Sequence, residues 1–105
     1  MTETEYRQLA DAAFPHIESV LAPADNDLDY ELVAGGVLEI EFDNDSKIII
    51  NRQGANQEIW VVAKSGGFHY RWQDNAWRNT CDGSELMQTL TGLIAQQGGG
   101  AISFD

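Results

Sequence analysis

Carboxylates gathered in the first part of the chain are the residues whose type and spacing could do chemistry. Of the 17 Asp and Glu residues, twelve lie in the first 45 positions, where Arg7 is the one basic residue. Seven of them form a strip over the predicted first helix, the loop after it and the first strand: Glu3, Asp11, Glu18, Asp25, Asp27, Asp29 and Glu31. Such hard oxygen ligands suit weak, exposed binding of iron, manganese or calcium better than a closed zinc or copper site. A solvated acidic face that maintains solubility is the alternative explanation.

The polarised charge restricts the class of partner. The net charge is −11 and lies almost entirely before residue 46, because acidic and basic residues balance in the rest of the chain. A field of this sign repels nucleic acid and anionic membranes, and it attracts cations and basic protein surfaces. We therefore expect no nucleic-acid partner and no membrane partner.

The segment that begins at Asp25 matches only the start of an EF-hand calcium loop. Its sixth position holds Tyr30 and its twelfth holds Gly36. An EF-hand needs glycine at the sixth position and a bidentate glutamate at the twelfth. The acidic segment is therefore not an EF-hand.

The remaining nucleophiles and bases do not form a recognisable catalytic motif. Ser84, His69 and Asp74 could be combined on paper into a triad, but no nucleophile elbow accompanies them. His16 is expected on the polar side of the first helix, and two histidines are too few for a metal site by themselves. Cys81, the one cysteine, is interpreted as structural, because the neighbouring acid opposes the lowering of its pKa by a helix start. We predict no enzymatic activity.

A tryptophan on a predicted strand suggests a docking surface. Alternation along 58–64 places Ile59 and Val61 in the core and turns Glu58, Trp60 and Val62 to the opposite face. A tryptophan exposed there, with Asn51, Arg52 and Gln53 around it, is the kind of anchor that protein interfaces use. The alternative is that the alternation slips and Trp60 belongs to the core.

Two helices and six strands are predicted to position these side chains. Apolar residues at helical spacing predict a helix over 4–22, with Thr2 and Glu5 as its capping box. At Pro15 we expect a kink rather than a break, because the apolar stripe resumes at Ile17. A second helix is expected over about 83–97, capped by Asp82, with Gly92 allowing close approach of another backbone. Turn signals separate the predicted strands: 30–33, 37–42, 46–52, 58–64, 68–73 and 76–79.

This order of elements predicts an α+β fold with a single domain over residues 1–105. Short turns make neighbouring strands antiparallel, and two helices with apolar stripes need one sheet face to cover. The expected architecture is a two-layer α/β sandwich, with both helices on one face of a sheet of about six strands. The apolar tail with Ile102 and Phe104 is expected to lie back across the helices. Without a signal peptide or a long apolar run, the chain is expected in the cytoplasm.

Two segments closely resemble the bacterial frataxin family of the CyaY type. They are Lys47 to Ala63, which reads KIIINRQGANQEIWVVA, and Gly66 to Trp77, which reads GGFHYRWQDNAW. The resemblance continues through Leu9 to Asp11, the GGVL of Gly35 to Leu38 and the DG of Asp82 and Gly83, so it covers essentially the whole chain.

The resemblance implies a frataxin-like fold and a role in iron–sulfur cluster assembly. It implies that the acidic ridge of seven carboxylates binds ferrous or ferric iron weakly, with no organic cofactor, and docks on the cysteine desulfurase that supplies sulfur. It also implies that Asn51, Gln53 and Trp60 contact partners, and that the protein binds beside the desulfurase and the iron–sulfur scaffold protein. Relatives commonly carry further acids near the end of the first helix, where this chain has Ser19, Ala22 and Pro23.

The leading hypothesis is a non-enzymatic regulator of cluster assembly, monomeric or with an iron-dependent oligomer. The alternative is an iron donor or storage protein that supplies ferrous iron to acceptors. A ferroxidase is a third hypothesis, and the chain lacks the paired Glu-x-x-His motifs of di-iron carboxylate bundles.

Overall fold

The computed structural model describes residues 2–21, 28–33 and 36–97. Helix α1 spans Glu3–Leu21 and begins at the predicted capping box. The Thr2 hydroxyl accepts the Glu5 backbone N–H at 3.1 Å, and the Glu5 carboxylate accepts the Thr2 backbone N–H at 3.3 Å. The helix runs unbroken across Pro15. The continuity predicted from the apolar stripe is therefore confirmed.

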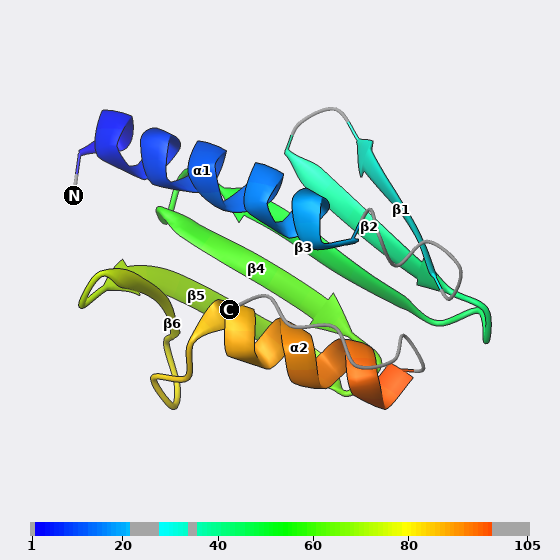
Figure 1. Cartoon of the computed structure of the whole chain (residues 1–105). Helices are drawn as coiled ribbons and strands as arrows, with labels where there is room; N and C mark the ends of the chain where they lie inside the picture. Colours follow the sequence, from blue (N-terminus) through cyan, green and yellow to red (C-terminus); the bar gives the residue numbers. More distant parts are fainter. Residues whose placement is uncertain (1, 22–27, 34–35, 98–105) are drawn as a thin grey trace.

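Six antiparallel strands follow, joined in sequence order into one sheet (Figure 1). Their order is that of a simple meander, and the two edge strands are the first and the last. The β5–β6 turn needs positive φ at Asp74 and Asn75, which are residue types that tolerate the left-handed region of a hairpin turn. The strands are β1 (Leu28–Val33), β2 (Val37–Phe42), β3 (Lys47–Gln53), β4 (Glu58–Ala63), β5 (Gly66–Gln73) and β6 (Ala76–Asn79).

Helices α1 and α2 (Leu86–Gln97) both cover one face of the sheet (Figure 1). The core lies between the two layers, where alternate strand residues such as Ile40, Ile50 and Ile59 are fully buried. The helix residues that complete this core are Tyr6, Ala10, Ala13, Phe14, Ile17, Leu21, Leu86, Leu90, Leu93 and Ile94. The predicted two-layer α+β sandwich is confirmed.

The start of α2 and the role of one glycine differ from expectation. Glu85 caps the helix: its carboxylate accepts the Met87 backbone N–H at 2.7 Å, and its carbonyl accepts that of Thr89. Asp82 instead accepts the N–H and hydroxyl of Ser84 in the preceding turn. Gly92 is exposed with no atom near the position of an added Cβ, so no backbone approaches it.

Three expectations fall outside the described residues. These are the packing of the tail with Ile102 and Phe104, and the positions of Asp25 and Asp27 in the loop after α1.

Neither of the described helices combines the length and the apolar character that crossing a membrane requires.

Candidate functional site

The face of the sheet that the helices leave uncovered gathers the residues predicted to contact partners. Antiparallel register places residues that lie directly opposite one another on the same face. Asn51 on β3 lies opposite Trp60 on β4, and Trp60 lies opposite His69 on β5. Gln53 lies opposite Glu58 along the same two strands. We call this uncovered side of the sheet the open face.

Trp60 is half-buried on the open face because the next strand covers one side of its indole. The His69 imidazole stacks on it with ring centroids 4.3 Å apart and an interplanar angle of 7°. The alternative that Trp60 belongs to the core is thereby wrong, since Ile59 and Val61 fill the core and Trp60 points away from it. Both residues of the pair keep part of their surface accessible to solvent.

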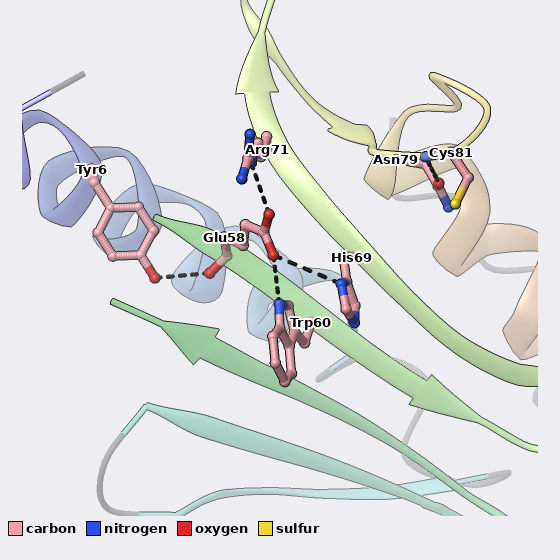
Figure 2. Close-up of polar contacts among 7 residues, drawn as sticks. All are labelled: Tyr6, Glu58, Trp60, His69, Arg71, Asn79 and Cys81. Carbon is pink, nitrogen blue, oxygen red and sulfur yellow. Dashed lines mark hydrogen bonds and ion pairs between the residues drawn. The ribbon is translucent and has the colours of Figure 1, made fainter. Parts of the chain in front are cut away.

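Glu58 points to the open face as predicted, but it is buried rather than exposed. Only 5% of its surface is accessible, and its two carboxylate oxygens are held separately (Figure 2). Trp60 Nε1 donates to Oε1 at 2.7 Å, and Arg71 Nε donates to Oε2 at 2.7 Å. His69 Nδ1 lies 3.8 Å from Oε1.

These contacts keep the Glu58 carboxylate charged. Burial raises its pKa and is the largest single influence, but it is outweighed by the Trp60 N–H, the Arg71 hydrogen bond and charge, and the nearby His69. The net result is a pKa below the usual value of 4.5. A charged, buried carboxylate on a sheet face is costly unless it is paired in this way.

Sequence reasoning placed Arg52 beside Trp60, and the structure corrects this. Arg52 lies opposite Ile59, so it faces the helices. Its guanidinium forms an ion pair with Asp11 of α1 and lies 4.8 Å from the centroid of the Phe14 ring. The side chain therefore ties β3 to α1 instead of ringing the exposed tryptophan, because neighbouring strand residues point to opposite faces.

The carboxylates of the predicted ridge divide between the two layers. Asp29 and Glu31 on the edge strand β1 lie on the open face. Glu3 and Asp11 lie on α1, where each is paired with an arginine, Glu3 with Arg7 at 3.2 Å.

Two further acids that sequence reasoning did not include extend the acidic part of the open face. Glu39 lies directly opposite Glu31, and Glu41 directly opposite Asp29. These four acids line a shallow hollow with Lys47, whose Nζ is 3.8 Å from Glu39 Oε1. Strict alternation in Val37–Phe42 was the signal that could have identified them.

Among the described residues, no three His, Cys, Asp or Glu side chains lie close enough together to hold a metal ion.

Glu18 is half-buried and lines a separate cleft between α1 and the β1–β2 hairpin, with Asp11 and Leu32. His16 is exposed on α1 as predicted, and Cys81 is a free, exposed cysteine.

His69 and Arg71 could have been recognised from the hairpin that joins β4 and β5. A two-residue turn at Lys64 and Ser65 pairs Ala63 with Gly66, and counting back along the ladder pairs Trp60 with His69. The predicted strand ends were too imprecise to set that register.

Comparison with known proteins identifies the fold and family. Residues 1–100 match the frataxin-like domain. Two relatives carry the name iron-sulfur cluster assembly protein CyaY. The protein of Dechloromonas aromatica is 51% identical over 102 residues, which cover 97% of each chain. The protein of Herminiimonas arsenicoxydans is 50% identical over 103 residues, which cover 94% of this chain and 92% of its own.

Solved structures agree with this assignment. Frataxin from Psychromonas ingrahamii superposes with a TM-score of 0.90 at 30% identity and covers 100% of this chain and 99% of its own. A trimeric frataxin from the yeast Saccharomyces cerevisiae, complexed with ferrous, has a TM-score of 0.69 at 22% identity and covers 92% of this chain and 86% of its own, which shows the shared fold. With the match over residues 1–100 and relatives half identical along nearly their whole length, the chain belongs to the frataxin family, in its bacterial CyaY branch.

Proposed function

We propose that this chain is a non-enzymatic regulator of iron–sulfur cluster assembly that docks on a cysteine desulfurase through its acidic surface. The observation that carries the proposal is the composition of the open face, where paired acids on β1 and β2 lie on the same side of the sheet as Asn51 and the stacked Trp60–His69 pair. The relatives named for cluster assembly support the pathway. In this proposal Trp60, in the aromatic part of the same face, also contacts the desulfurase, and the scaffold protein binds beside it.

Electrostatics set the kind of partner surface. A net charge of −11 concentrated in the first 45 residues favours encounter with a basic patch. Contacts between exposed charges weaken steeply with ionic strength, because the Debye length falls from about 30 Å at 0.01 M salt to about 8 Å at 0.15 M. Docking is therefore expected to depend strongly on salt.

Iron has a secondary place in the proposal. The cross-strand acid pairs of β1 and β2 offer hard oxygen ligands, which suit ferrous or ferric iron at an exposed and weak site. Glu3 and Asp11 are already paired with arginines, so metal binding there competes with an ion pair. Iron is a cargo or effector in this proposal and competes with the desulfurase for part of the acidic surface.

Charge reversal of Asp25, Asp27 and Asp29 to lysine tests the docking. Binding to the desulfurase of the same organism is measured by calorimetry across a salt series, with Trp60→Ala as a separate variant. The triple variant is expected to lose most of its affinity at low salt and most of its salt dependence. Unchanged affinity in that variant contradicts docking through the acidic surface.

The iron-donor alternative is separated from docking by an iron titration followed by NMR. Paramagnetic broadening confined to the acidic residues at micromolar iron favours donation, whereas broadening only at millimolar iron leaves docking as the main activity. Desulfurase and cluster-assembly rates, measured with and without the protein over the same titration, show whether it speeds or slows the reaction. Iron oxidation no faster than in a variant without the acids would exclude a ferroxidase.

A further inference from the structure

We propose that Glu58 is a positioning residue that holds Trp60 in the orientation required for docking. This inference rests on the proposed function, in which Trp60 contacts a partner. The indole N–H and the Glu58 carboxylate come from the same face of β4, two residues apart, and are joined by a hydrogen bond of 2.7 Å (Figure 2).

Burial separates positioning from direct contact. Glu58 is 5% exposed, so a partner that lies on the open face reaches little of it. Trp60 is half-buried and the His69 side chain is half-exposed, so both remain accessible to the partner. An effect of Glu58 on docking must therefore pass through the side chains that it holds.

The contacts of Glu58 restrict the indole from two sides. The hydrogen bond from Nε1 sets the rotation of the ring, while the stacked His69 imidazole limits its tilt. Arg71 holds the other carboxylate oxygen, so Glu58 cannot turn away without breaking a second charged hydrogen bond. Four neighbouring side chains on the open face of β4 and β5 thus hold one another in place: Glu58, Trp60, His69 and Arg71.

A free indole on a flat sheet populates several rotamers, of which one fits the partner. Apparent affinity falls in proportion to the fraction of molecules in that rotamer, because the others must reorganise before binding. Removing the carboxylate is therefore expected to weaken docking by about two- to tenfold.

Two substitutions separate the hydrogen bond from the charge. Glu58→Ala removes the acceptor, whereas Glu58→Gln keeps an amide oxygen within reach of the indole N–H. Asp74→Asn serves as the matched control, because it removes one exposed negative charge from the β5–β6 turn. Melting temperatures are measured for all variants, and if Glu58→Ala does not fold, the comparison rests on Glu58→Gln.

The first readout concerns the free protein. The Trp60 indole N–H signal is assigned by its loss in Trp60→Phe, and its hydrogen exchange is measured by NMR. Exchange is expected to be about tenfold or more faster in Glu58→Ala, with partial recovery in Glu58→Gln and no change in Asp74→Asn. Equal exchange in Glu58→Ala and the native chain overturns the inference.

The second readout is desulfurase affinity in a double-mutant cycle of Glu58→Ala and Trp60→Ala. The loss caused by Glu58→Ala is expected to disappear in the Trp60→Ala background, where no indole remains to position. If Trp60→Ala weakens binding and Glu58→Ala does not, or if the two losses simply add, the positioning role is wrong while docking stands. If Trp60→Ala binds like the native chain, the Trp60 contact of the proposed function is itself wrong.

Discussion

Reversal of one acid on the edge strand is expected to stabilise the fold and weaken its function at once. Glu31 on β1 lies directly opposite Glu39 on β2, and the neighbouring Asp29 lies opposite Glu41. Like charges at directly opposed positions destabilise a sheet. Glu31→Lys replaces one such repulsion with an attraction, and lysine is well tolerated on an edge strand.

The size of the effect follows from the geometry. Side-chain charges about 6 Å apart interact by about 0.7 kcal/mol in a water-like dielectric, and salt reduces this to about 0.5 kcal/mol. Loss of the repulsion and gain of the attraction together stabilise the fold by about 1 kcal/mol. For a domain of this size that corresponds to an increase in melting temperature of about 4–8 °C at low salt.

The assay compares melting temperature and desulfurase affinity for the native chain, Glu31→Lys and the control Asp43→Lys. The control makes the same change of net charge in the exposed β2–β3 turn, outside the paired strand positions. Glu31→Lys is expected to melt higher than the control and to bind the desulfurase about two- to tenfold more weakly at low salt.

Two results refute this reasoning. A melting temperature no higher than that of Asp43→Lys means that the opposed carboxylates do not repel measurably. A stabilised variant with unchanged affinity means that these acids only solvate the surface, as the solubility explanation holds. A gain in stability coupled to a loss of affinity is the pattern of residues retained for function.

Three further substitutions test other parts of the structure. Gly92→Ala fills open space on α2 and is expected to stabilise the fold by about 0.5–1 kcal/mol. The urea midpoint should rise while the dependence of the unfolding free energy on urea concentration stays the same. Destabilisation would mean that a neighbouring atom crowds this position. Gln97→Ala removes a buried amide that accepts the Lys64 backbone N–H at 3.0 Å and donates to the Ser46 hydroxyl. The free energy of unfolding is expected to fall by about 2–4 kcal/mol, and a fall below about 1 kcal/mol argues against this network. Folding lowers the pKa of Glu58, so the stabilisation from its charged carboxylate is complete above the unfolded pKa and is lost as pH falls through the folded pKa. The difference in melting temperature between the native chain and Glu58→Gln is therefore expected to shrink below about pH 4.5. A constant difference down to pH 3 contradicts this.

Local patterns were sufficient for most of the fold. The capping box at Thr2, the strand alternation around Ile40 and the helical spacing of Leu86, Leu90 and Leu93 depend on residues close in sequence, and all appear where expected. The predicted start of α2 was wrong because aspartate is a preferred N-cap residue type and glutamate is not, yet Asp82 is engaged by Ser84 in the preceding turn and Glu85 takes the cap position.

The site was predictable in composition but not in arrangement. The sequence by itself determined that the chain is acidic at its beginning, that Trp60 alternates away from the core, and which family it resembles, because charge, period and motif are local properties. Tertiary structure decided which of these groups meet. Glu58 became buried through Arg71 and Trp60, and the acids of α1 and β1 were assigned to different layers. Strand register and layer packing join positions far apart in sequence, so no local pattern contains them.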